Sequence, residues 1–318
     1  MKSEGSRIPV IIDTDPGQDD AVAILFALAA KDQLDVLGIT TVSGNVPLEL
    51  TTRNARIIVD WSGRTDVGVY SGCARPLLRP LYTAESVHGK EGLEGVPLHE
   101  PNTPLHEKHA VDFLVSTLSQ APDHAITICC IGPLTNLACA LTQAPEIVRG
   151  IKELVIMGGA YFVRGNTTPT AEFNIYVDPH AAAIVFASGV PIIVIPLDVT
   201  YKVLATYARI ESLRNVGNNT GRLISQILTC YERKTMANPD SPEGPLHDPC
   251  TIAYLIEPTL FSGRHVNVSV ETSSELTLGE TVVDWNRRTP HAPNALWITE
   301  ADSDRFFSLL TRFVSRLP

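Results

Sequence analysis

Four aspartates stand close together near the beginning of the chain, in the segment Asp13-Thr14-Asp15-Pro16-Gly17-Gln18-Asp19-Asp20. Carboxylates at this spacing repel one another, and their pKa values rise unless a cation or strong hydrogen-bond donors compensate. A helix that begins at Asp19 and Asp20 would supply donors through its unpaired N–H groups. That arrangement explains these two residues but leaves Asp13 and Asp15 unexplained, so the segment favours a bound cation.

The residue types of this segment also indicate which cation it would hold. Carboxylate and carbonyl oxygens are the ligands that Ca²⁺ and Mg²⁺ prefer. The segment contains no His or Cys, which disfavours zinc. We therefore predict a site for a hard divalent ion, beside the carboxyl end of the strand that ends at Asp13.

The elements that must position these carboxylates follow a repeating pattern of a short apolar run, a turn with Gly or Pro, and a helical stretch. The predicted strands are Val10–Asp13, Val36–Thr41, Val67–Ser71, Ile126–Ile131, Leu154–Met157 and Ile192–Leu197. Continuous apolar runs separated by helices are typical of a mostly parallel sheet that is buried on both faces. One helix start is clear, because Asp178 can cap the helix, Pro179 suits its first position, and Gly189 would end it.

Neither a linker nor a repeat nor a shift in composition divides the sequence. We therefore predict one α/β domain over residues 1–318, with a doubly wound, mostly parallel (mixed) sheet. Ligands of such sheets bind beyond the carboxyl ends of the strands.

The amino-acid composition limits the classes of molecule that the protein could bind. The chain is 44% hydrophobic and 19% charged, with a net charge of −10. This acidity argues against nucleic acid and against an anionic membrane, and it leaves a small neutral or cationic substrate or a metal ion. The cysteines form no CxxC pair and are expected to be free thiols in a reducing compartment. The apolar stretch Val10–Ile12 is too short for a signal-peptide core, so we expect a cytoplasmic protein.

A family resemblance extends this interpretation. The run DTDPGQDDAVAIL resembles the N-terminal signature of the nucleoside hydrolases, the inosine–uridine-preferring ribohydrolases. Further blocks match in order from residue 10 to about 298: Thr41–Asn45, Val87–Leu93, Ile131–Asn136, Ile156–Gly159, Gly165-Asn166, Ala171–Asn174, Leu246–Pro249 and Thr281–Asp284. The resemblance implies a Rossmann-like nucleoside hydrolase fold, one Ca²⁺ per subunit, and a homodimer or homotetramer. It also implies hydrolysis of ribonucleosides to ribose and free base.

The resemblance assigns roles to particular residues. Asp15 would bind the ion and act as the general base, while Asp20 and Asp248 would be the other carboxylate ligands. Asp248 would also touch the ribose. The main-chain carbonyl of Ile131 would complete the metal site, at a position where many relatives carry Thr, and Asp13 would support the ligands from behind.

The sugar contacts follow in the same way. Asp19 would hold a ribose hydroxyl, and Met157 would pack beneath the sugar ring. The remaining predicted sugar contacts are Asn45, Asn166, Glu172 and Asn174. Breaking an N-glycosidic bond passes through an oxocarbenium-like state, which surrounding carboxylate and amide oxygens stabilise. Direct attack by a water activated by the ion and by Asp15 would invert the anomeric carbon.

The residues that help the base to leave are harder to assign. His247 lies beside the predicted ligand Asp248 and is our leading candidate, and His88 is a second one. In the segment Tyr231–Pro245, residues Tyr231, Arg233 and Asn238 are candidates to line the base pocket. That segment matches no family pattern, so the preferred base stays open.

Two other functions compete with this interpretation. Asp13-Thr14-Asp15 is similar to the nucleophile motif of haloacid-dehalogenase phosphatases, but the later conserved groups of that class are not found in order, and Asp15-Pro16-Gly17 makes a different turn. A non-catalytic, metal-assisted binder of nucleosides or ribose on the same fold is the second alternative. It would have no need for a base beside the metal.

Overall fold

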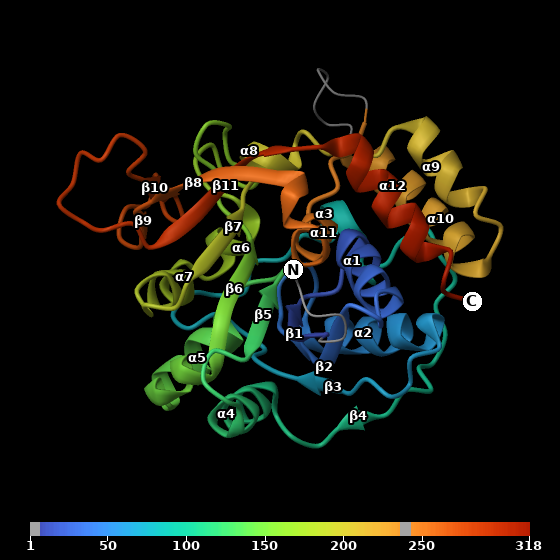
Figure 1. The fold of residues 1–318 in the computed structure, drawn as a ribbon, viewed down its shortest axis with the longest axis horizontal. Coiled ribbons are helices and arrows are strands. Elements are labelled where there is room, and N and C mark those ends of the chain that lie inside the picture. Colours follow the sequence, from blue (N-terminus) through green and yellow to red (C-terminus); the bar gives the residue numbers. More distant parts are fainter. Residues whose placement is uncertain (1–6, 236–242) are drawn as a thin grey trace.

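The computed structural model describes residues 7–235 and 243–318, which form an α/β fold around a large sheet (Figure 1). The nine strands of this sheet lie in the order β4-β3-β2-β1-β5-β6-β7-β11-β8. Their bounds are β1 Ile8–Thr14, β2 Leu34–Thr41, β3 Val69–Ser71, β4 Leu105–His106, β5 Ile126–Cys130, β6 Ile151–Met157, β7 Ile192–Ile195, β8 Phe261–Val266 and β11 Ala295–Ala301. The strands β9 (Val268–Val270) and β10 (Thr281–Val283) form a separate antiparallel pair.

The sheet is parallel apart from one edge. Strand β8 pairs antiparallel with β11, whereas β11 pairs parallel with β7. The predicted class, an α/β fold with a mostly parallel mixed sheet, is confirmed. Each predicted strand exists, with bounds shifted by up to three residues.

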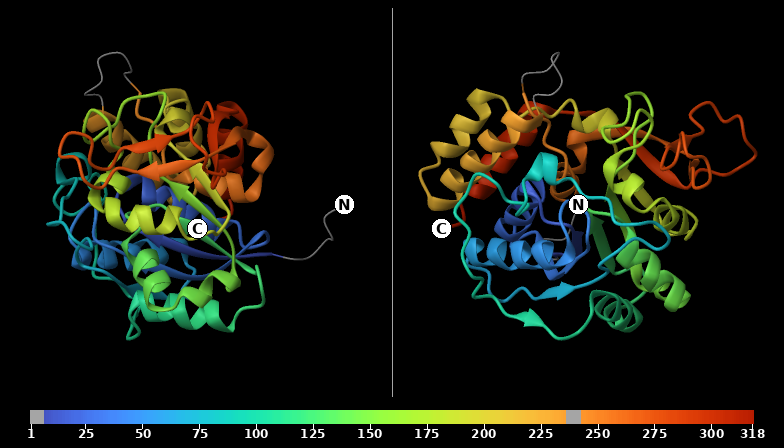
Figure 2. Two further views of the ribbon diagram at one scale, coloured as in Figure 1. Left: turned by 90° about the vertical axis from the view of Figure 1, so that its left-hand side faces the viewer. Right: turned by 180° about the vertical axis from the view of Figure 1, so that it is seen from behind.

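Helices cover both faces of the sheet (Figure 2). They are α1 Gln18–Ala29, α2 Leu48–Ser62, α3 Glu85–His88, α4 Ala110–Gln120, α5 Thr135–Gln143, α6 Phe173–Val177, α7 Pro179–Phe186, α8 Leu197–Thr200, α9 Tyr207–Arg214, α10 Asn219–Thr235, α11 Pro249–Ile256 and α12 Ser303–Val314, with short 3-10 turns at Pro145–Gly150 and Pro258–Leu260. Strand β1 shows how the two cores are separated. Val10 and Ile12 pack with α1, α2, α11 and α12, while Ile11 packs on the opposite face with α4, α5 and α7.

Two local predictions can be compared with the structure. Asp178 caps α7, because its carboxylate accepts the N–H of Ala181 at 3.0 Å, and Pro179 occupies the first position. The helix ends at Phe186, three residues before Gly189, which adopts the left-handed region at φ +78°. Among the described residues, no helix combines the length and the apolar character needed to cross a membrane.

The strand order reverses between β1 and β5, and the candidate site lies at this position. The chain from β1 runs outward to β4 on one side, and β5 begins the other half of the sheet. Connections leaving the carboxyl ends of two such strands diverge and leave a crevice where ligands bind in open α/β sheets. The aspartate segment follows β1 at this crevice, and Ile131 follows β5.

Candidate active site

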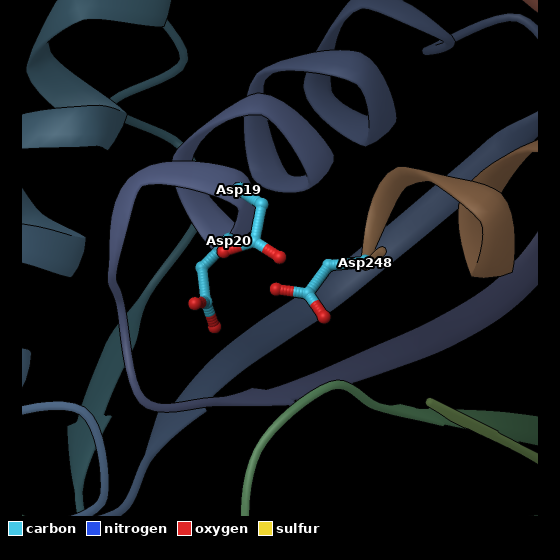
Figure 3. A group of neighbouring side chains, drawn as sticks. All are labelled: Asp19, Asp20 and Asp248. Carbon is cyan, nitrogen blue, oxygen red and sulfur yellow. The ribbon is translucent and has the colours of Figure 1, made fainter. Parts of the chain in front are cut away.

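Three aspartates from opposite ends of the sequence converge in a buried cluster (Figure 3). Asp19 and Asp20 belong to the first turn of α1, and Asp248 directly precedes α11. Each offers a carboxylate oxygen, and these oxygens lie within 4.8 Å of one another. The side chains of Asp19 and Asp248 point toward each other in Figure 3. The predicted meeting of Asp20 with a residue near the other end of the chain is therefore present in the fold.

The turn between β1 and α1 fixes the orientation of Asp20. Its carboxylate accepts the main-chain N–H of Gly17 at 2.9 Å and the hydroxyl of Thr14 at 2.5 Å. The amide of Asn45 also donates to it at 3.1 Å. These bonds hold the carboxylate at the helix start without a side-chain cation.

Asp15 lies beside the cluster, although it is not one of the three mutually close carboxylates. One oxygen, Oδ2, accepts the N–H of Asn45 at 2.7 Å. The other, Oδ1, is buried and has no hydrogen-bond partner in the described part of the chain. Gly44 and Gly132 press against the two oxygens so closely that a Cβ at either position would stand 2.0 and 2.5 Å away. The carboxylate is thus held in a tight cradle with one oxygen unsatisfied.

The electrostatics of the four aspartates are unfavourable without a cation. Burial raises the pKa of all four, and mutual repulsion adds to the pKa shift of Asp15, Asp19 and Asp248. The pKa of Asp19 reaches about 7. Among the residues whose burial is described, no Lys or Arg is buried to offset this charge. An oxygen-rich, electron-rich cluster with an unsatisfied carboxylate oxygen fits a hard divalent cation.

Asp13 and Ile131 lie next to the cluster and are held by hydrogen bonds to each other and to neighbouring residues. The carboxylate of Asp13 accepts hydrogen bonds from Thr40 and Asn136 at 2.5 and 2.8 Å, although burial still raises its pKa to about 6. Its main-chain carbonyl accepts the N–H of Ile131 at 2.8 Å. The carbonyl of Ile131 in turn accepts from Asn174 at 3.1 Å, which leaves its second lone pair available.

A cavity of about 530 Å³ opens above the cluster. Every residue to which the resemblance assigned a substrate or catalytic role lines this cavity, except Asp15, which lies deeper. Ile131 and the base-pocket candidate Tyr231 also line it. The lining residues that were predicted are Asp19, Asn45, His88, Ile131, Met157, Asn166, Glu172, Asn174, Tyr231, His247 and Asp248. The fold therefore brings together polar groups from six of the matched sequence blocks.

The middle of the cavity is organised around Glu172. Its carboxylate caps α6 by accepting the N–H groups of Asn174 and Ile175, and it also accepts the N–H of Gly159. Burial nevertheless raises its pKa to about 7. Asn174 donates to the carbonyls of Ile131 and Met157, so the floor and the wall of the cavity are bonded together.

The two candidate histidines, His88 and His247, both line the cavity. His247 is buried, which lowers its pKa to about 4, and its Nδ1 is 2.7 Å from the hydroxyl of Thr200. His88 accepts the main-chain N–H of Gln18 at 3.2 Å, and its ring stacks on Tyr231 at 5.7 Å. Tyr231 lines the cavity as predicted. Asn238 and the side chain of Arg233 lie outside the described residues.

Several lining residues were not identified from the sequence. They are Tyr82, Thr83, Ala84, Ser86, Val87, Thr167, Phe173, Tyr201, Leu204, Glu243 and Pro245. Phe173 stands inside the matched block Ala171–Asn174, so that block contained a usable signal. Tyr82 comes from the long irregular segment after β3, and its ring is 6.3 Å from that of Phe173. Only the fold brings these two aromatic side chains together.

The parallel α/β sheet and the acidic cavity, which opens where the strand order reverses, fit the nucleoside hydrolases that the sequence motifs resemble. Residues 10–308 match the family model described as inosine-uridine preferring nucleoside hydrolase, and the chain belongs to this family. It is an N-ribohydrolase, an enzyme that hydrolyses the N-glycosidic bond of ribonucleosides. The resemblance found in the sequence motifs is thereby confirmed.

Individual members of the family are similar to this chain over nearly its whole length. It is 46% identical over 309 residues to an uncharacterized protein of Schizosaccharomyces pombe, covering 97% of this chain and 99% of the relative. It is 42% identical over 307 residues to the pyrimidine-specific ribonucleoside hydrolase RihA of Escherichia coli, covering 95% and 97%. A plant nucleoside hydrolase superposes with a TM-score of 0.91 at 33% identity, over 98% and 99% of the chains. A purine-preferring ribonucleoside hydrolase from Gardnerella vaginalis superposes with a TM-score of 0.90 at 31% identity, over 96% and 98%. Relatives with opposite base preferences therefore share this fold.

Proposed function

We propose that this chain hydrolyses ribonucleosides to ribose and free base in a Ca²⁺-dependent reaction in which Asp15 is the general base. The observation that carries the proposal is the meeting of Asp19, Asp20 and Asp248 in one buried cluster, of which Asp19 and Asp248 line the cavity, with an unsatisfied oxygen of Asp15 beside them. A metal-assisted protein that only bound nucleosides could use the cluster to hold its ion, but it would have no need for a base such as Asp15 beside that ion.

The residues that would hold the ion are Asp15, Asp20, Asp248 and the carbonyl of Ile131. All are oxygen donors, which is the ligand type that Ca²⁺ selects. Asp19 is close enough to share in this site, and we assign it to a ribose hydroxyl because it lines the cavity whereas Asp15 and Asp20 lie deeper. When bound, Ca²⁺ orients oxygen groups of the substrate and makes water more acidic.

The side chains of the chain itself account for the rest of the reaction. Asp15, held by Asn45 and the two glycines, removes a proton from the attacking water. Positive charge develops on the ribose as the glycosidic bond lengthens, and the carboxylates of Asp19 and Glu172 stabilise it. Asn45, Asn166 and Asn174 bind sugar hydroxyls, and Met157 packs against the ring.

We assign the departure of the base to His247. Thr200 can donate its hydroxyl hydrogen to Nδ1, which places the imidazole proton on Nε2 and leaves that N–H free to bond the base. A hydrogen bond to the departing nitrogen lowers the cost of the negative charge that forms there. His88 and Tyr231, whose rings stack on each other and line the cavity, are further contacts for the base.

The test is a panel of purine and pyrimidine ribonucleosides assayed by release of the free base with Ca²⁺ present. We expect turnover of at least one nucleoside, and Asp15→Asn should lower kcat by about 10²–10⁴-fold because it removes the base while keeping the shape. An Asp15→Asn enzyme with wild-type activity would overturn this role. Nucleoside binding without turnover would indicate the non-catalytic binder, and p-nitrophenyl phosphate hydrolysis would indicate a phosphatase.

The stereochemistry gives a second test of the same proposal. Direct attack by water from the face opposite the base produces α-ribose first, which NMR can detect before mutarotation. A trapped covalent adduct between the sugar and a carboxylate would contradict direct attack.

A further inference from the structure

Two cysteines lie close together near the carboxyl ends of the strands, on the same side of the sheet as the site. Cys73 follows β3, and Cys139 lies on α5. Their Sγ atoms are 3.9 Å apart, with the thiol of Cys73 donating to the sulfur of Cys139. All six cysteines are free thiols in the structure, and among them Cys73, Cys139 and Cys230 are partly exposed. The proposed reaction uses none of them.

We infer that Cys73 and Cys139 form an oxidisable pair, which a peroxide converts into a disulfide that adjusts the adjacent cavity. Oxidation would bring the two sulfurs from 3.9 Å to the ~2.05 Å of a disulfide bond. The thiolate of Cys139 attacks one oxygen of hydrogen peroxide, the O–O bond breaks, and hydroxide leaves to give a sulfenic acid. Cys73 then attacks that sulfur and expels water, so two thiols and one peroxide give one disulfide and two water molecules.

The environment of the pair suits these two roles. The hydrogen bond from Cys73 lowers the pKa of Cys139 to about 7, whereas it raises the pKa of Cys73 strongly, together with burial. Cys139 is thus the nucleophile that meets the oxidant, and Cys73 is the resolving thiol. Cys129, Cys130 and Cys250 are fully buried and have raised pKa values, so they should react much more slowly.

A disulfide between Cys73 and Cys139 would affect the active site through hydrogen bonds of the main chain of Cys73. Cys73 donates its N–H to Asn136 at 2.8 Å, and Asn136 donates to Asp13 at 2.8 Å. The carbonyl of Cys73 accepts the N–H of Ser43 at 3.0 Å, two residues before Asn45, whose N–H holds Asp15. The same segment continues to Tyr82, Thr83 and Ala84 in the cavity wall. A shift of Cys73 toward α5 therefore disturbs both the residues that hold Asp15 and the part of the cavity wall formed by Tyr82, Thr83 and Ala84.

The first experiment treats the full chain with hydrogen peroxide and reads the product by intact mass and by non-reducing peptide mapping. We expect loss of two hydrogens, a peptide linking Cys73 to Cys139, and reversal by dithiothreitol. Cys73→Ser and Cys139→Ser should each abolish the link, and Cys230→Ser should leave it unchanged. A sulfinic acid at Cys139 in the wild type, or a link through any other cysteine, would overturn the pair.

The second experiment measures kcat/KM for a nucleoside before and after oxidation. We expect a fall of about tenfold or more in the wild type and in Cys230→Ser, because displacement by about 1 Å near a reacting centre can cost 10²-fold. The Cys139→Ser enzyme should lose less than twofold under the same treatment. A complete disulfide with unchanged kcat/KM would disprove the coupling to the site. Failure of the hydrolase assignment is distinguishable, since the mass measurement requires no activity.

Discussion

The inner and outer ends of the cavity are built in different ways. At the inner end, Asp15, Asp20 and Asp248 are at most 3% exposed and follow directly on a strand or begin a helix. At the outer end, Tyr82 is 45% exposed and lies in the long irregular segment between β3 and α3. Main-chain N–H groups hold the carboxylates of Asp20 and Asp15, whereas Tyr82 is placed by a ring contact between its irregular segment and Phe173 of α6.

This difference explains how one fold can serve different bases. The chemistry on ribose is common to every nucleoside, and the carboxylates assigned to it, Asp15, Asp19 and Glu172, stand at the ends of strands and helices. The base varies, and loop residues can change without disturbing the sheet. RihA is described as pyrimidine-specific and the Gardnerella vaginalis enzyme as purine-preferring, yet both match this chain over nearly its whole length.

The largest effect should come from removing the ion, which tests the inner end alone. Treatment with EDTA should lower kcat/KM by at least about 10³-fold, because metal catalysis supplies several kcal/mol. Saturating Ca²⁺ should restore activity and raise Tm, since an ion at 100 times its Kd stabilises the folded state by about 2.7 kcal/mol. Full activity in a chelated sample shown to be metal-free would refute metal dependence.

Loss of His247, the residue assigned to the leaving base, should have the next largest effect. His247→Ala should lower kcat by about 10²–10³-fold on a nucleoside, because a donor to the developing charge is lost. With p-nitrophenyl riboside, whose leaving group is stable as an anion, the loss should be within about tenfold. Equal losses on both substrates would show that His247 does not assist the leaving group. Thr200→Val is the matched variant and should show the same pattern more weakly.

A substitution that moves the carboxylate of Asp15 but keeps the residue itself tests whether catalysis depends on the exact position of that carboxylate. In Gly132→Ala the new Cβ would stand 2.5 Å from Oδ1 of Asp15, so we expect a fall in kcat of about 10²-fold. Gly189→Ala is the control, because its φ of +78° costs about 1 kcal/mol of stability, yet nothing lies within 4 Å. If both variants lose stability but keep activity, the cradle around Asp15 is not needed for turnover.

The smallest effect should come from the exposed outer wall. Tyr82→Ala should change the ratio of kcat/KM for uridine and inosine by about tenfold, since one pocket contact is worth about 1–3 kcal/mol. Its affinity for Ca²⁺ should stay at the wild-type value. Asp20→Asn should do the reverse, weakening Ca²⁺ binding while keeping the ratio of the two substrates. A change of both quantities in either variant would mean that the two ends are coupled.

Much of the sheet was predictable because its strands are buried on both faces and read as continuous apolar runs. The predictions missed three strands of this sheet: β4, which has only two residues, β8, in which only the first and last residues are buried, and β11, which lies between β7 and β8. In β11 only the first four residues, Ala295–Ile298, form an apolar run. β4 and β8 lack the apolar run that marks an interior strand, since both lie at an edge of the sheet. The antiparallel direction of β8 was not assigned for the same reason.

The sequence by itself determined the acidic segment after β1, the ordered family motifs and the type of reaction, because these depend on residue identity and local order. The resemblance implied that Asp20 and Asp248 share an ion, but only the tertiary structure decided how the side chains are grouped. It added Asp19 to that pair, placed Tyr82 near Phe173, and brought Cys73 against Cys139. Such contacts join segments up to 229 positions apart in the numbering, from Asp19 to Asp248. They follow from the packing of strands and helices, which local sequence patterns do not encode.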